Sequence, residues 1–154
     1  MQPRLIVAAG LVWLGPHRLL VQRRPAGARH GAGALELPGG KVEPGEPPRA
    51  ALRRELVEEW GPAAAALAIG PVAEVLHHVY PGPGPEVLLI VYHVDASPWL
   101  GTDWHAALRL EADAAVVAHE LAALPVHEFL AADREFVTDV RDGRVEPPTL
   151  PIHP

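Results

Sequence analysis

One segment, Leu37 to Gly61, constrains this chain more than any other: LPGGKVEPGEPPRAALRRELVEEWG. Three glycines and four prolines precede a run with helical spacing, so a stiff turn is predicted to lead into a helix. Five glutamates fall between Glu43 and Glu59. So many negative charges repel one another unless a cation lies among them. That cation is either an arginine or lysine side chain or a metal ion.

The helix predicted over residues 48–60 has two distinct faces. Two prolines suit its first turn, and Gly61, followed by another proline, ends it. Glu55, Glu58 and Glu59 lie at i, i+3 and i+4, so their carboxylates share one face. The apolar residues on the other face are Ala51, Leu52, Leu56 and Trp60.

The acidic face has two interpretations when the residues are taken alone. Three carboxylates on one face are the hard oxygen ligands that Mg²⁺ or Mn²⁺ accepts. The carbonyl of Gly40 could join them, because glycine permits close approach. The alternative is an exposed acidic helix, although no basic residue follows Glu59 within the helix to relieve the repulsion. The carboxylate spacing leaves both interpretations open.

The segment as a whole resembles the Nudix box, G-x5-E-x7-R-E-U-x-E-E-x-G-U, in which U is aliphatic. Gly40, Glu46 and the run 54–61 match it, and only Pro62 departs, at a position that packs in the core of the family. The resemblance implies an α+β fold: an α/β/α sandwich with a mixed β-sheet flanked by helices and the box helix after the glycine-rich loop. It also implies hydrolysis of a diphosphate linkage.

The resemblance assigns roles to the residues of the box. In the family the box glutamates bind divalent cations, here Glu55, Glu58 and Glu59, and the first glycine, here Gly40, often adds its carbonyl. The implied cofactor is Mg²⁺ or Mn²⁺. Arg54 would hold a glutamate in place through an ion pair. Either Glu55 or Glu58 would act as the base toward water, and the sequence does not choose between them.

Sequence on both sides of the box resembles the MutT-type branch of the family. The resemblance places Arg24 and Tyr80 at the substrate, Asp133 at the edge of its base and Glu111 near the metal ions. Each has an ordinary structural alternative, respectively a strand-end charge, a core aromatic, a helix cap and a loop acid. The segments that carry this resemblance are LLVQRRPAGARHGAGALELPGG, HHVYPGPGPEVLLIVYHV and LPVHEFLAADREFV.

Three functions compete. The MutT-like flanks favour a nucleoside triphosphate pyrophosphohydrolase that releases a nucleoside monophosphate and pyrophosphate, with 8-oxo-purine nucleotides among its possible substrates. A hydrolase of ADP-ribose, dinucleoside polyphosphates or nucleotide sugars is the second, because Tyr80 and Pro81 lie near the position where those branches carry a marker. The third is a non-catalytic nucleotide-binding regulator, but such modules commonly lose box glutamates, and this chain keeps them.

The remainder of the chain is expected to complete a single domain, 1–154, with a proline-rich tail at 144–154. Residues 96–118 are expected to be irregular, and helical patterns predict helices at 119–125 and 127–143. Short apolar runs predict strands at 5–14, 18–24, 35–37, 69–80 and 86–95.

Composition narrows the partners and the location. A net charge of −6 argues against nucleic-acid binding, which needs a basic surface. No apolar run approaches the ~20 residues that span a bilayer, so no membrane association is expected. The chain has no cysteine and hence no disulfide framework, and we expect a cytoplasmic protein. A small phosphorylated molecule is therefore the expected partner, and the sequence leaves monomer and homodimer both open.

Overall fold

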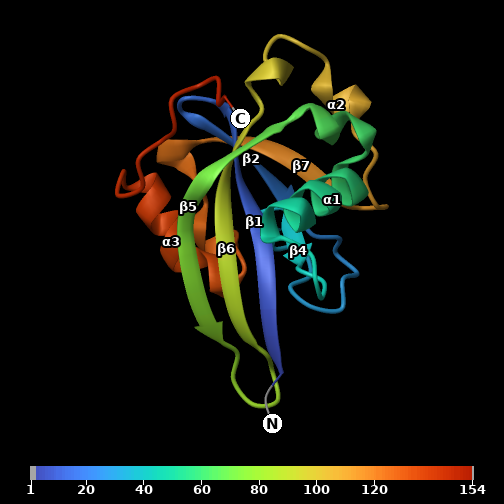
Figure 1. Cartoon of the computed structure of the whole chain (residues 1–154), viewed down its shortest axis with the longest axis vertical. Helices are drawn as coiled ribbons and strands as arrows, with labels where there is room; N and C mark the ends of the chain where they lie inside the picture. The colour runs from blue at the N-terminus through green and yellow to red at the C-terminus, as the bar shows by residue number, and fades with distance from the viewer. Residues whose placement is uncertain (1–2, 154) are drawn as a thin grey trace.

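A mixed β-sheet forms the middle layer of the computed structural model, which describes residues 3–153 (Figure 1). β1 and β6 run parallel and every other pair is antiparallel, so the predicted mixed sheet is confirmed. The path across the sheet is β3 (Leu35–Glu36), β2 (Arg18–Arg23), β1 (Arg4–Gly15), β6 (Glu86–Asp95) and β5 (Ala68–Val79), while β4 (Gly39–Lys41) pairs with β1 and β7 (Ala115–Glu120) with β2.

Alternation along β1 divides the core between the two faces of the sheet, because successive strand residues point to opposite sides. Ala8 and Val12 pack on the face covered by α1 (Pro48–Trp60). Leu11 and Trp13 pack on the face covered by α3 (Ala131–Arg141). The sheet thus has a helix on each side, which is the sandwich that the box resemblance implies (Figure 1).

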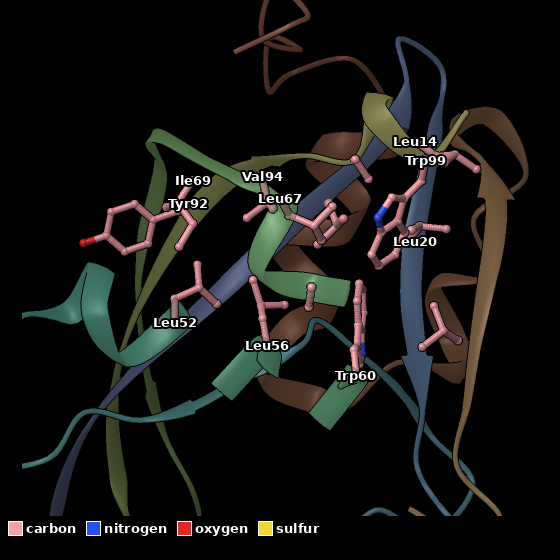
Figure 2. Packing of buried hydrophobic residues seen from close by; sticks show 14 of the residues in the cluster. Leu14, Leu20, Leu52, Leu56, Trp60, Leu67, Ile69, Tyr92, Val94 and Trp99 are labelled. Atoms are coloured by element: carbon pink, nitrogen blue, oxygen red, sulfur yellow. The ribbon is translucent and has the colours of Figure 1, made fainter. Parts of the chain in front are cut away.

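The box helix α1 begins and ends where the sequence predicts. Its apolar face is fully buried, and Figure 2 shows Leu52, Leu56 and Trp60 packed among side chains of the sheet. The helix stops at Gly61, whose φ of 93° suits glycine. Pro62 then starts a 3-10 turn, Pro62–Ala66, and places Ala64 in the same core cluster, so the departure from the box pattern is accommodated locally.

The prediction of a short helix at 119–125 is wrong. Residues 115–120 form β7, which pairs with β2 from Arg23↔Ala115 to Arg18↔Glu120, and the rest of the predicted range holds one 3-10 turn, Leu121–Ala123. The two valines of this segment suit a strand, and pairing with a neighbouring strand overrides a weak helical pattern. Part of the region expected to be irregular is therefore sheet.

Two further boundaries differ from the prediction. The helix expected at 127–143 spans only Ala131–Arg141, because a 3-10 turn, Val126–Glu128, and two extended residues precede it, and the Leu130 N–H donates to the Leu35 carbonyl at 2.9 Å. The glycines after Pro38 were expected to form a turn, but Gly39–Lys41 pairs with β1 as β4. A Cβ at Gly39 would overlap the carbonyl of Ala8, so the close pairing needs glycine there.

The tail is ordered against the domain, although residues 144–153 contain no helix or strand. The Ile152 N–H donates to Oδ2 of the buried Asp95 at 2.8 Å, and the Ile152 side chain seats over Gly70. Residues 1–2 and 154, which belong to the expected domain and tail, lie outside the described residues. Within 3–153, no helix has the length and apolarity needed to cross a bilayer.

Candidate functional site

A pocket of about 460 Å³ opens beside the acidic face of α1. α1 contributes Glu55, Glu58 and Glu59, Arg24 enters from the end of β2, and Glu111 enters from the loop before β7. The structure therefore brings together five side chains that the sequence proposed for the site. The remaining lining residues are Gln22, Pro25, Gly27, Ala28, Arg29, Glu36 and Ala114.

Gly40 lies in β4 directly against the first of these carboxylates. A Cβ at this position would overlap the carboxylate of Glu55, so glycine leaves the space that this carboxylate occupies. The neighbouring Gly39 N–H donates to Oε2 of Glu59 at 3.3 Å. The glycine pair therefore places backbone groups beside two box glutamates.

Arg54 donates hydrogen bonds to three glutamates of the box. Its Nε and Nη2 donate to the two oxygens of Glu46, both at 2.9 Å, and its Nη1 donates to Glu55 at 2.9 Å and Glu58 at 3.2 Å. The bonds from Arg54 lower the pKa of Glu46 to about 2 and raise the pKa of the guanidinium. Arg54 thus makes the glutamate contacts that the box resemblance assigns to it.

The surroundings of Glu59 raise its pKa, whereas those of Glu46 lower the pKa of that residue. Burial, together with the negative charges of Glu36 and Glu55, raises the pKa of Glu59 to about 8, against a weaker lowering by the Gly39 N–H and Arg24. Burial also raises the pKa of Glu36, although the Arg24 guanidinium opposes it. Among residues 3–153, five carboxyl groups but only two arginines, Arg24 and Arg29, line the pocket, so its acidic side chains outnumber its basic ones.

This donor set fits a hard divalent cation. No three His, Asp or Glu side chains within residues 3–153 are already disposed as a metal site. However, Arg54 contacts only Oε1 of Glu55 and Oε2 of Glu58, so each of these glutamates keeps a second oxygen for a ligand. The repulsion that raises the pKa of Glu59 is the kind that a bound cation relieves.

Tyr80 and Asp133 do not line this pocket. The Tyr80 ring packs edge-on against His78, with centroids 4.4 Å apart, beside the core on the α3 side. Asp133 is buried in α3, where it accepts a hydrogen bond from the Leu37 N–H at 3.4 Å, and burial raises its pKa to about 7. The Leu37 N–H that Asp133 binds belongs to the residue after Glu36, so Asp133 lies close to that residue of the pocket wall. Burial raises the pKa of Tyr80, and the charges of Asp133 and Glu36 add to this effect.

The sequence analysis assigned no role to Glu36, which lines the pocket next to Leu37, the residue that Asp133 binds. Arg24 Nη1 donates to its Oε2 and Gln22 Nε2 to its Oε1, each at 3.1 Å. Gln22 in turn accepts a hydrogen bond from Trp60 Nε1 at 2.7 Å, which connects the helix end to the pocket wall. The only signal in the sequence was an acid between two apolar residues immediately before the glycine turn.

A family model described as NUDIX domain matches residues 4–140. A protein of Proteus vulgaris named 8-oxo-dGTP diphosphatase is 30% identical over 118 residues, which is 77% of this chain and 94% of that protein. An Escherichia coli protein of the same name is 45% identical over 58 residues, 38% of this chain and 44% of that protein. The matched segments span less than half of the length of the first curated relatives.

The fold is likewise shared with solved structures. A MutT NUDIX hydrolase from Burkholderia pseudomallei superposes with a TM-score of 0.67 at 26% identity, covering 89% of this chain and 98% of that one. The aligned part thus covers most of this chain, so the two proteins share their overall fold.

Proposed function

The chain belongs to the NUDIX domain family, and we propose that it is a metal-dependent hydrolase that converts a nucleoside triphosphate into a nucleoside monophosphate and pyrophosphate. The relatives named 8-oxo-dGTP diphosphatase make oxidised purine nucleotides the first substrates to test. The observation that carries the proposal is the pocket itself. Three box glutamates and Glu111 face one cavity whose volume suits a nucleotide-sized ligand.

Divalent metal ions are a general requirement of Nudix hydrolases, and Mg²⁺ or Mn²⁺ is the proposed cofactor here. Glu55, Glu58 and Glu59 would hold it, with the Gly40 carbonyl and Glu111 as further oxygen donors. When bound, such an ion neutralises diphosphate oxygens and lowers the pKa of an attacking water. Arg54 supports this arrangement, because its bonds to Glu55 and Glu58 fix one oxygen of each and orient the other.

One box glutamate must accept the proton that the attacking water loses. Glu55 and Glu58 are both candidates, and both line the pocket. Glu55 is confined between Arg54 and Gly40, whereas the Glu58 side chain is 58% exposed. The exposure of Glu58 to solvent suits a group that reaches a water, and the confinement of Glu55 suits a fixed ligand. Glu58 is therefore the first position to substitute.

The nucleoside would lie toward Glu36, because the other proposed substrate residues adjoin that side. Arg24 reaches the pocket as half of an ion pair with Glu36, so it contributes hydrogen bonds more than net charge. Asp133 has a pKa of about 7, and near neutral pH its carboxyl group is present in both protonated and ionised forms. A protonated carboxyl group donates as well as accepts, so Asp133 could match a base edge of either kind.

A substrate panel tests the proposal. Purified protein is incubated with ordinary and 8-oxo nucleoside triphosphates, ADP-ribose, dinucleoside polyphosphates and nucleotide sugars, each with Mg²⁺, with Mn²⁺ or with a chelator. We expect metal-dependent release of pyrophosphate from at least one triphosphate. The product identifies the bond cleaved, because cleavage of the terminal bond would release inorganic phosphate instead.

Other outcomes point elsewhere. Cleavage of ADP-ribose or a dinucleoside polyphosphate alone would contradict the triphosphate proposal while retaining a diphosphate hydrolase. If every substrate stayed intact yet nucleotides bound, a non-catalytic regulator would be favoured instead. The intact set of glutamates facing one pocket argues against that regulator.

A further inference from the structure

The arginines around the pocket differ in how far their charge is already neutralised. The Arg54 guanidinium forms ion pairs with Glu46, Glu55 and Glu58. Arg24 pairs with Glu36 at 3.1 Å, and its Nε donates to the carbonyl of His30 at 2.8 Å. Neither arginine therefore brings an uncompensated positive charge to the cavity.

Arg29 is different. It lines the same pocket from the loop between β2 and β3, and its side chain is exposed. Within residues 3–153, the Arg29 side chain makes no hydrogen bond and no ion pair with another residue. The other residues of this loop that line the pocket, Pro25, Gly27 and Ala28, carry no charged side chain. Arg29 is thus the uncompensated cation of the pocket wall.

The loop that carries Arg29 is anchored on both sides of it. Arg23 Nη1 donates to the carbonyl of Gly33 at 2.7 Å, and the Arg24 backbone N–H donates to that of Ala34 at 2.9 Å. The bond from Arg24 Nε to His30 pins the residue that follows Arg29. The backbone at this position is therefore held at the pocket, while the Arg29 side chain stays free to bind a ligand.

We propose that Arg29 binds the phosphate chain of the substrate. This assignment rests on the proposed hydrolase function, because it requires an anionic ligand in a pocket that five carboxylates line. Those carboxylates repel such a ligand, and metal ions at the box glutamates would offset the repulsion only on the α1 side. Arg29 offers a positive charge from the loop side, and its planar guanidinium matches two phosphate oxygens at once.

The test compares Arg29→Gln and Arg29→Lys with wild-type protein and with a matched control, Arg144→Gln. Arg144 is exposed, does not line the pocket and pairs with Asp139, so its substitution removes the same charge elsewhere. Steady-state kinetics with the best triphosphate gives kcat and KM separately. Pyrophosphate, a phosphate chain without a base, is measured as a competitive inhibitor and, by calorimetry with Mg²⁺, as a ligand.

We expect Arg29→Gln to raise KM and the inhibition constant of pyrophosphate about three- to tenfold, the range for an exposed charge-assisted contact, with kcat nearly unchanged. The dependence of kcat/KM on ionic strength should also weaken. Arg29→Lys should recover part of the affinity, because it keeps the charge but loses the two-point geometry. Arg144→Gln should behave as wild type.

Two results would overturn the assignment: Arg29→Gln matching Arg144→Gln in KM and in pyrophosphate affinity, or a fall in kcat with both constants unchanged. The failure of the proposed function is a separate result, in which wild-type protein cleaves no triphosphate. The calorimetric comparison still decides the role of Arg29 in that case, because it needs no turnover.

Discussion

Glu46 beside α1 and Asp133 in α3 are both hydrogen-bonded carboxylates, yet their pKa values shift in opposite directions. Glu46 accepts two bonds from Arg54, which lower its pKa to about 2. Asp133 accepts one bond of 3.4 Å from the Leu37 N–H, and burial raises its pKa to about 7. The difference lies in the cation: a guanidinium reaches Glu46, whereas no salt bridge reaches Asp133 within the part of the chain that the structure describes.

The two surroundings suit two tasks in the proposed reaction. Around Arg54, hydrogen bonds hold both oxygens of Glu46 and one oxygen each of Glu55 and Glu58 before any ligand arrives, which suits metal binding. Around Asp133, the carboxyl group sits near the point of half-protonation at neutral pH, which suits recognition of a neutral base edge. The predictions that follow test whether this division holds.

The largest effect is expected at the box. Glu58→Gln removes a proposed base or metal ligand while keeping the size of the side chain, and we expect the rate to fall by about 10²- to 10⁴-fold. Stability should hardly change, because the side chain is 58% exposed. Pyrophosphate release and thermal unfolding, measured on one preparation, separate the two effects. A variant that kept wild-type activity would exclude Glu58 as the base and leave Glu55 as the candidate.

Asp133→Asn is expected to change stability and its pH dependence. The native pKa of Asp133, about 7, lies above its ordinary value, so the folded protein keeps a proton that the unfolded chain releases between about pH 4 and pH 7. The free energy of unfolding therefore falls as the pH rises through that window. Asparagine does not ionise, so the variant should lack this contribution and exceed wild type by about 2–4 kcal/mol at pH 8.

Urea denaturation at intervals from pH 4 to pH 8 measures this difference. The two proteins should approach each other as the pH falls to 4 and below, toward the ordinary aspartate pKa, where Asp133 becomes protonated in both states and the asparagine oxygen can still accept from the Leu37 N–H. The comparison cancels the contribution of Glu59, whose pKa is also raised, because that residue is present in both proteins. Equal slopes against pH would show that Asp133 is not buried as an acid.

Local periodicity explains why so much of α1 could be predicted. The apolar face, the carboxylate face and the glycine stop all depend on residues within the helix or next to it. The strands predicted at 5–14 and 18–24 and at 69–80 and 86–95 were confirmed for the same reason, since each pair joins runs that are neighbours in the chain. Features that depend on distant pairing were not predicted: β7 pairs with β2 across about a hundred residues of chain, and its helical reading was wrong.

The residues of the site likewise fall into those that local sequence predicts and those that depend on distant contacts. The box spacing predicted Glu55, Glu58 and Glu59, because one helix places them together. Glu36 and Arg29 escaped notice, because their importance comes from partners or from a lack of them. A sequence shows that an arginine is present, but only the structure shows that Arg24 is paired while Arg29 faces the pocket without a partner among residues 3–153.

A smaller effect is expected from Gly40→Ala, which tests whether the position of Glu55 matters apart from its presence. The added methyl group would overlap the carboxylate of Glu55, a flexible side-chain end that can move away. The backbone of Gly40 is not strained, so we expect little loss of stability but a fall in activity of about tenfold or more. Activity assays at several Mg²⁺ concentrations, with thermal unfolding as control, measure it. Wild-type activity would mean that Glu55 is not a fixed ligand.

The smallest effect is expected from Glu46→Gln, which replaces the carboxylate whose pKa is lowered. Because the native pKa of about 2 lies below the ordinary value, Glu46 stabilises the fold above about pH 4.5, and this contribution is lost as the pH falls toward about 2. The variant should lack that loss, so its pH dependence should differ from wild type in the opposite sense to that of Asp133→Asn. The pair with Arg54 is only partly buried, so solvent screens it, and the difference should be small and should shrink in high salt. Denaturation at low and high ionic strength, from about pH 5 to pH 3, measures it. A stability difference between variant and wild type that persisted in high salt would mean that Glu46 acts as a buried group. The opposite pKa shifts of Glu46 and Asp133 would then come from the hydrogen bonds of Arg54 alone, and not from a difference in burial.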